Sequence, residues 1–86
     1  MKILYSKNAY KFLSKLDKKS VQRIRNAVYG LTLNPPEGNI VPLKGYSDGR
    51  KRLRLGNWRI IFRIDDNDEV KILFIIDIGN RGDVYK

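Results

Sequence analysis

The chain has 86 residues, with 18 Lys or Arg against nine Asp or Glu and a formal net charge of +9. It has neither cysteine nor histidine, which excludes a disulfide framework and argues against zinc or redox-metal sites. A chain of this length predicts a single domain, residues 1–86, with a modest core. The N-terminus lacks the apolar core of a signal peptide and no apolar run is long enough to span a membrane, so we expect a cytoplasmic protein.

The charge is distributed unevenly along the sequence. Residues 1–64 carry fifteen basic residues against Asp17, Glu37 and Asp48, whereas residues 65–86 carry three basic residues against six acids. A charge this basic predicts an anionic partner, and nucleic acid, an acidic protein and a membrane surface are the three candidates.

The N-terminal part of the chain predicts a short strand and a helical hairpin. Residues 2–5 are the strand, and Ser6 suits the N-cap of the helix that follows. Apolar residues then recur with the i, i+3, i+4, i+7 spacing of two amphipathic helices, whose basic outer faces we interpret as solvated surface. Asn34-Pro35-Pro36 ends the second helix, because proline lacks an N–H and disfavours helix in the residue before it. The apolar positions are Ala9, Phe12, Leu13, Leu16, Val21, Ile24, Val28 and Leu31.

A β-hairpin over residues 49–63 is the clearest element. Two runs rich in β-forming residues flank Gly56-Asn57, a two-residue turn of the kind that hairpins favour. Successive strand side chains point to opposite faces, so the apolar side chains of both strands share one face with Lys51. The arginines on the other face are Arg50, Arg52, Arg54, Arg59 and Arg63.

This register predicts two like-charged pairs, with Arg54 opposite Arg59 and Arg50 opposite Arg63. Like charges directly opposite each other on a sheet repel. The arginines are therefore either a solvated polar face or a binding surface for an anion, whose phosphate oxygens a planar guanidinium fits well. The absence of a carboxylate among them favours the binding surface.

The remaining segments predict further strands. Residues 40–46 form a strand that Pro42 confines to a sheet edge. The acidic run Asp65-Asp66-Asn67-Asp68 lacks a calcium-loop pattern, and we interpret it as a turn without a metal. Residues 70–78 are almost wholly apolar, which predicts a central strand covered on both faces. Strict alternation places Ile72, Phe74 and Ile76 on the arginine side of that strand.

The order of these elements predicts an α+β fold. The N-terminal strand and helical hairpin pack on one face of a twisted, mainly antiparallel sheet of four or five strands. The apolar face of the central hairpin meets the helices, and the arginine face is left open for a ligand.

The sequence RLRLGNWRIIFRI, an apolar strand and the terminal IGNRGDVY together resemble the RelE/ParE superfamily of bacterial and archaeal toxins. These toxins belong to type II toxin–antitoxin pairs, and the resemblance covers nearly the whole chain. It implies a RelE-like, microbial-RNase-like fold. Members similar to RelE cleave mRNA in the ribosomal A site without a cofactor, whereas ParE-like members poison DNA gyrase.

The resemblance also implies site residues. Arg59, Arg81 and Tyr85 match the arginine after the turn, the arginine after the last strand and the terminal tyrosine of RelE-like enzymes, which favours the ribonuclease branch. Arg52 completes the catalytic set. Arg50 and Arg52 stand where RelE has lysines, and a base role does not transfer to them because arginine stays charged. The residues expected to bind RNA are Arg50, Arg54, Lys51, Lys44 and Arg63.

The residues permit a metal-free cleavage by 2′-OH attack, which needs a proton acceptor, stabilisation of the phosphorane and protonation of the leaving oxygen. Tyr85 is the expected proton acceptor, because no carboxylate is expected on the arginine face. Arg59 clamps the phosphate and Arg81 assists the leaving oxygen. A set of groups this weak suits an enzyme whose substrate is positioned on a ribosome.

The expected partners follow from the same resemblance. They are an acidic, RelB-like antitoxin and the A site of the 30S ribosomal subunit with its mRNA and rRNA, with no membrane contact. Two other functions stay open: a ParE-like gyrase poison, and a nucleic-acid-binding module without catalysis.

Overall fold

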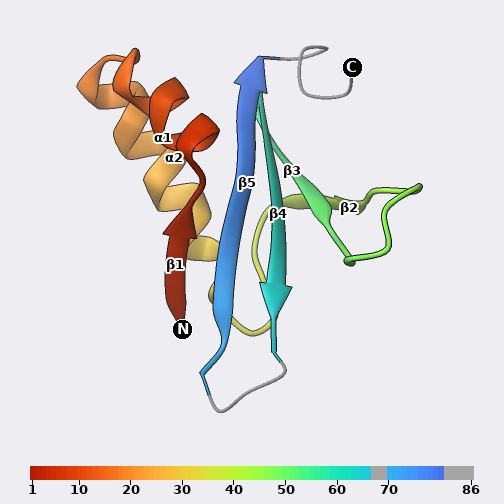
Figure 1. The fold of residues 1–86 in the computed structure, drawn as a ribbon. Helices are drawn as coiled ribbons and strands as arrows, with labels where there is room; N and C mark the ends of the chain where they lie inside the picture. The colour runs from red at the N-terminus through yellow and green to blue at the C-terminus, as the bar shows by residue number, and fades with distance from the viewer. Residues whose placement is uncertain (67–69, 81–86) are drawn as a thin grey trace.

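The computed structural model describes residues 1–66 and 70–80, and within them two helices pack on a five-stranded sheet. The predicted α+β architecture is confirmed (Figure 1). The strand order is β1-β5-β4-β3-β2, in which β1 is parallel to β5 and the other pairs are antiparallel. The elements are β1 (Lys2–Tyr5), α1 (Lys7–Ser14), α2 (Lys18–Gly30), β2 (Asn39–Pro42), β3 (Lys51–Leu55), β4 (Trp58–Asp65) and β5 (Ile72–Asn80).

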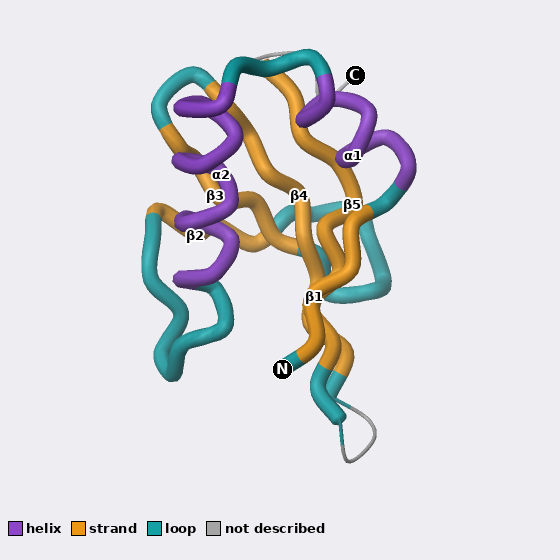
Figure 2. Tube along the Cα trace, turned by 90° about the vertical axis from the view of Figure 1, so that its left-hand side faces the viewer, coloured by secondary structure: helices purple, strands orange, loops and turns teal. Residues whose placement is uncertain are grey.

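Both helices lie on one face of the sheet, as Figure 2 shows from the helical side. Their apolar faces and the inward side chains of the strands form a single core, because each amphipathic face must be buried against another. The opposite face of the sheet carries no helix in the described part of the chain. Neither described helix is long and apolar enough to cross a membrane. The core residues are Ala9, Ile24, Val28, Leu31, Leu53, Ile60, Phe62, Leu73, Ile75 and Ile78.

Ser6 caps α1 as predicted and also ties the helix to the sheet. Its hydroxyl accepts a hydrogen bond from the amide of Ala9 at 3.0 Å and donates one to the carbonyl of Ile76 at 2.6 Å. Asp17 caps α2 by accepting from the amide of Ser20 at 3.4 Å. Each cap satisfies one of the backbone amides that a helix N-terminus leaves without a partner.

The second helix ends at Gly30, earlier than the prolines predict. The next residues continue as a tighter turn, in which the amides of Thr32 and Leu33 bond to the carbonyls of Tyr29 and Gly30. Such i→i+3 bonds commonly close the last turn of a helix. Leu31 is fully buried, so this turn still contributes to the core.

The central hairpin forms with the predicted turn and register. Gly56 has φ +58°, and no described residue other than glycine has positive φ, which is the pattern of a type II′ turn with glycine first. Arg54 lies opposite Arg59, as expected. The predicted pair of Arg50 with Arg63 is wrong, because β3 begins at Lys51 and Arg50 belongs to the preceding loop.

The edge position of β2 is confirmed, but the strand ends at Pro42 and residues 43–46 lie outside it. Proline cannot donate to a strand ladder. The chain then turns, and the amide of Leu43 donates to the carbonyl of Arg50 at 3.2 Å, which closes the loop between β2 and β3.

A β-bulge changes which side chains of β5 face the arginines. Ile61 pairs with Asp77 but its neighbour Phe62 pairs with Ile75, so Ile76 has no partner in the register. The extra residue reverses the alternation beyond it. Strict alternation therefore fails after Ile76. Asp77 lies on the arginine side, and Ile78 enters the core with 3% of its surface exposed.

The strand β5 is fully buried on one face only, whereas the sequence predicted a strand covered on both faces. Leu73 and Ile75 on the helical side are buried, whereas Ile72 and Phe74 on the other side are half-buried. The cover that Phe74 does have comes from Arg63, whose guanidinium carbon lies 4.4 Å from the centre of the ring.

Candidate nucleic-acid interface

Four arginines share the sheet face that lies opposite the helices. They lie on two adjacent strands, β3 and β4, and alternate along each strand with inward-facing side chains. We call this set the arginine surface. Its members are Arg52, Arg54, Arg59 and Arg63.

Arg52 and Arg54 are the members of β3. The side chain of Arg54 is exposed, and that of Arg52 is half-buried. The Nε atom of Arg52 is buried and has no hydrogen-bond partner among the described residues. A buried donor without a partner costs about 1–3 kcal/mol, so an acceptor supplied by a bound ligand would stabilise this side chain.

Arg59 is buried, with 4% of its surface exposed. Its Nη1 atom donates to the carbonyls of Gly56 at 3.3 Å and Trp58 at 3.2 Å, which anchors the guanidinium at the hairpin turn. Arg54, directly opposite on β3, is the more accessible of the two.

The guanidinium of Arg63 lies over the ring of Phe74, which is opposite it on β5. A ring offers no hydrogen-bond acceptor of the kind that a carboxylate does, so the cation–π contact leaves the N–H groups of the guanidinium able to bind a ligand. The apolar ring thus holds the cation in place on the open face without neutralising it.

Asp77 and Asp65 also lie on this face, since they pair with Ile61 and Ile72. The expectation that the arginine face lacks a carboxylate is therefore wrong. Sequence reasoning missed Asp77 because strict alternation along β5 assigns it to the core side. One of its oxygens, Oδ1, accepts a hydrogen bond from the amide of Ile78 at 2.9 Å.

Arg50 lies in a compact cluster of its own. Its side chain binds both oxygens of Asp48 at 2.8–3.2 Å and stacks on Tyr46, 4.1 Å from the ring centre. The hydrogen bond from Arg50 lowers the pKa of Asp48. The guanidinium of Arg50 is therefore already paired with a carboxylate. RNA binding by Arg50 stays a prediction.

The structure separates the other predicted site residues. Lys44 is exposed in the loop after β2, and Lys51 lies opposite Phe62, on the side of the sheet that faces the helices. Arg81 and Tyr85 lie outside the described residues. Asn80, the last residue of β5, is opposite Trp58, so the described chain ends beside the hairpin turn.

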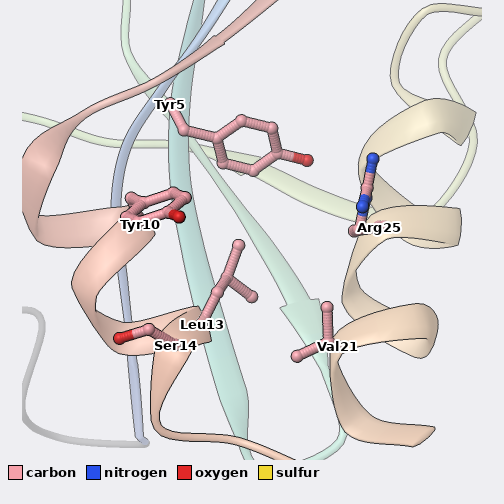
Figure 3. Close-up of a pocket in the computed structure, with 6 residues that line it drawn as sticks. All are labelled: Tyr5, Tyr10, Leu13, Ser14, Val21 and Arg25. Carbon is pink, nitrogen blue, oxygen red and sulfur yellow. The ribbon is translucent and has the colours of Figure 1, made fainter. Parts of the chain in front are cut away.

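A groove between the two helices is a second feature, and the sequence did not indicate it. It has a volume of about 320 Å³ and lies between α1, α2 and β1 (Figure 3). Burial of Tyr5 raises its pKa, and the positive charge of Arg25 partly offsets this increase. Tyr10, at 70% exposed, lies at the open side of the groove. The lining residues are Tyr5, Tyr10, Leu13, Ser14, Val21 and Arg25.

The described residues hold no group of three or more side chains suited to a metal ion. Within residues 1–66 and 70–80, the basic surface thus combines guanidinium groups with two carboxylates at separate positions along the strands, Asp77 opposite Ile61 and Asp65 opposite Ile72. This arrangement can bind phosphate oxygens and stabilise developing negative charge.

The fold matches those of solved bacterial toxins. The YoeB/ParE toxin from Agrobacterium tumefaciens superposes with a TM-score of 0.76 at 22% identity, over 94% of this chain and 99% of that one. A chain of the RelBE2 toxin–antitoxin complex from Mycobacterium tuberculosis gives 0.72 at 24% identity, over 93% and 96%. The isolated RelE toxin of Escherichia coli gives 0.72 at 19% identity, over 98% and 89%. The fold is thus that of the RelE toxins.

The sequence itself matches the family described as ParE toxin of type II toxin–antitoxin system, parDE, over residues 3–85. The chain belongs to this family and is a toxin of the RelE/ParE superfamily. No curated protein matches the sequence.

Proposed function

We propose that this toxin is an mRNA endonuclease that acts on the ribosome, in the A site of the 30S subunit, and so inhibits translation. The observation that carries the proposal is the arginine surface, above all Arg52, whose buried Nε has no hydrogen-bond partner within residues 1–66 and 70–80 and lies next to the exposed Arg54. Phosphate oxygens supply the acceptors that such side chains require. The retention of Arg81 and Tyr85 in the sequence supports the same function.

In the proposed reaction, the 2′-OH of the substrate attacks the adjacent phosphorus and the 5′-oxygen leaves, which gives a 2′,3′-cyclic phosphate. Arg52 and Arg54 hold the non-bridging oxygens, and the buried charge of Arg59 stabilises the phosphorane from below. Tyr85 accepts the proton of the 2′-OH as its phenolate, a form that nearby cations favour, and Arg81 donates a proton to the leaving 5′-oxygen. Asp77, which lies on the same face opposite Ile61, is a second candidate for accepting that proton.

We also propose an acidic, RelB-like antitoxin as partner of the toxin in the cytoplasm. The net charge of +9 supports this, as does the similarity to a toxin solved as the RelE–RelB complex from Pyrococcus horikoshii, at 23% identity and a TM-score of 0.70. The antitoxin either covers the arginine surface or displaces Tyr85. The groove of Figure 3 offers apolar area with Arg25 at its side for an amphipathic acidic segment.

Primer extension on ribosome-bound mRNA tests the nuclease. The wild-type chain is expected to produce discrete cleavage sites, and Arg54→Ala to reduce the cleavage rate by at least about tenfold through loss of a phosphate contact. Arg25→Ala is the matched control, since Arg25 is an exposed arginine on α2, on the opposite side of the sheet. Equal rates for the wild type and Arg54→Ala would contradict the proposed role of this surface.

A gyrase poison is the second candidate, because the family that the sequence matches is described as ParE. Purified gyrase and supercoiled plasmid distinguish the two functions. Accumulation of gyrase-linked DNA breaks, with ribosome-bound mRNA left intact, would replace the nuclease proposal with this one.

A further inference from the structure

A second concave site lies at the tip of the β3–β4 hairpin, on the helical side of the sheet. Its volume is about 340 Å³. It is separate from the groove of Figure 3, with which it shares no lining residue. The lining residues are Arg23, Gly56, Asn57, Trp58 and Asn80.

The chemistry of this pocket suits a nucleobase. Trp58, the chain's single tryptophan, is half-buried, and the guanidinium carbon of Arg23 lies 5.3 Å from its ring centre. Aromatic rings and guanidinium planes are the surfaces on which proteins stack unpaired bases. The exposed side chains of Asn57 and Asn80 supply amide donors and acceptors that can read the edge of a base.

The charge of the pocket also suits RNA. Arg23 is exposed and has no ion-pair partner among the described residues, and no carboxylate lines the pocket. Among the described residues, a bound nucleotide therefore meets one cation and two neutral amides, and none of the residues that line the pocket is acidic.

The pocket adjoins the arginine surface through the hairpin turn. Gly56 lines the pocket, and its carbonyl accepts the hydrogen bond from Arg59 of the arginine surface. Asn80 likewise lines the pocket, and the residue before it, Gly79, lies directly opposite Arg59. A strand whose phosphates contact the arginines can thus pass over the turn and place a neighbouring base in the pocket.

We propose that this pocket binds one base of the RNA substrate, next to the scissile phosphate, and sets the base preference of cleavage. The proposal rests on the nuclease function proposed above and adds a recognition site to it. The base lies against the Trp58–Arg23 pair, and Asn57 and Asn80 discriminate among bases by hydrogen bonding. The hairpin turn positions these residues, and Gly56 is required in it because its φ is positive, a conformation that is strained for other residues.

Trp58 provides the first test, because its fluorescence comes from inside the pocket. Nucleoside 5′-monophosphates are titrated into the full-length wild-type toxin, with ribose 5-phosphate and inorganic phosphate as probes without a base. Saturable quenching by the nucleotides, unequal among the four bases and absent with the two phosphates, is expected. Asn80→Ala is expected to weaken binding of the preferred nucleotide by about tenfold. Lys19→Ala, which removes an exposed cation of α2 outside the pocket, is expected to leave this affinity unchanged.

Absence of saturable quenching would overturn the proposal, and so would equal quenching by ribose 5-phosphate, which indicates a plain anion site. Unchanged affinity in Asn80→Ala would do the same. The titration needs neither ribosome nor cleavage, so its result is independent of the nuclease assay.

Mapping of cleavage sites completes the test. Asn80→Ala is expected to cleave ribosome-bound mRNA with an altered base preference at one position beside the cut. A wild-type pattern in this variant would refute the pocket as a reading site while leaving the nuclease intact. Quenching without any cleavage by the wild type would instead refute the nuclease function, and with it the assignment of the base to mRNA.

Discussion

Arg54 and Arg59 lie directly opposite each other on adjacent strands, and the two charges repel. We therefore expect Arg54→Ala to leave the free energy of unfolding unchanged or to raise it by a few tenths of a kcal/mol, while cleavage falls. Urea denaturation followed by Trp58 fluorescence measures the stability. Marked destabilisation by Arg54→Ala would reveal a structural role that the register does not indicate.

The proton acceptor can be assigned by comparing two residues. Tyr85→Phe keeps the ring and removes only the hydroxyl, and we expect it to lower single-turnover cleavage by roughly a hundredfold or more. Asp77→Asn keeps the shape of a side chain whose Oδ1 already binds the amide of Ile78, and we expect a change of only a few-fold. The reverse result would identify Asp77 as the base and Tyr85 as a packing residue.

The bond to Arg50 makes the stability of the loop between β2 and β3 depend on pH. Because the folded-state pKa of Asp48 is lowered, its contribution is present above the unfolded value, about 3.9, and is lost as pH falls through the lower folded value. We expect Asp48→Asn to flatten the acid limb of the stability curve and to have the same slope as the wild type above pH of about 5. An acid limb that is the same in Asp48→Asn and the wild type would show that the Asp48–Arg50 pair contributes nothing to the free energy of unfolding.

At the scale of elements, local sequence predicted the hairpin and could not predict the bulge. The Gly56-Asn57 turn fixes the register of β3 against β4 within a few residues, so the pairing of Arg54 with Arg59 follows from the sequence. The bulge at Ile76 depends on how β5 meets a strand across a longer turn, which alternation alone does not encode. That one residue moves Asp77 onto the candidate site.

Side-chain conformation limited the prediction in a similar way. The arginine surface was predictable because alternation assigns a face to each residue. The hydrogen bonds from Arg59 to the carbonyls of Gly56 and Trp58 were not predictable, because they depend on the conformation of the turn. The pairing of Arg50 with Asp48 likewise depends on the loop leaving the strand at Lys51.

The bulge also connects the sheet to α1, because Ile76 presents its carbonyl to the hydroxyl of Ser6. Ser6→Ala removes both this bond and the helix cap, and we expect a loss of about 1–2 kcal/mol in the free energy of unfolding. Ser14→Ala is the matched control, since its exposed hydroxyl donates only to the carbonyl of Lys11, and we expect a change within about 0.5 kcal/mol. Equal losses in both variants would contradict the tie between helix and sheet.

At the scale of the whole molecule, basic residues lie on both sides of the sheet. The arginine surface occupies one face, and exposed lysines and arginines of α1 and α2 occupy the other. The basic residues within positions 1–64 therefore lie on both faces of the sheet, and an acidic partner is attracted to either face.

This distribution predicts how the antitoxin associates. Long-range attraction to a +9 domain speeds the encounter, and mobile ions screen it over a Debye length of about 10 Å at 0.1 M salt. We expect the association rate constant, measured by stopped-flow mixing, to fall by at least about tenfold from low to high salt, while the dissociation rate changes much less. A double variant, Lys15→Ala with Lys19→Ala, lowers the charge on the exposed helical side and should reduce the salt dependence without touching the arginine surface. An association rate that stays constant across the salt range would show that apolar docking, and not charge, governs recognition of this toxin.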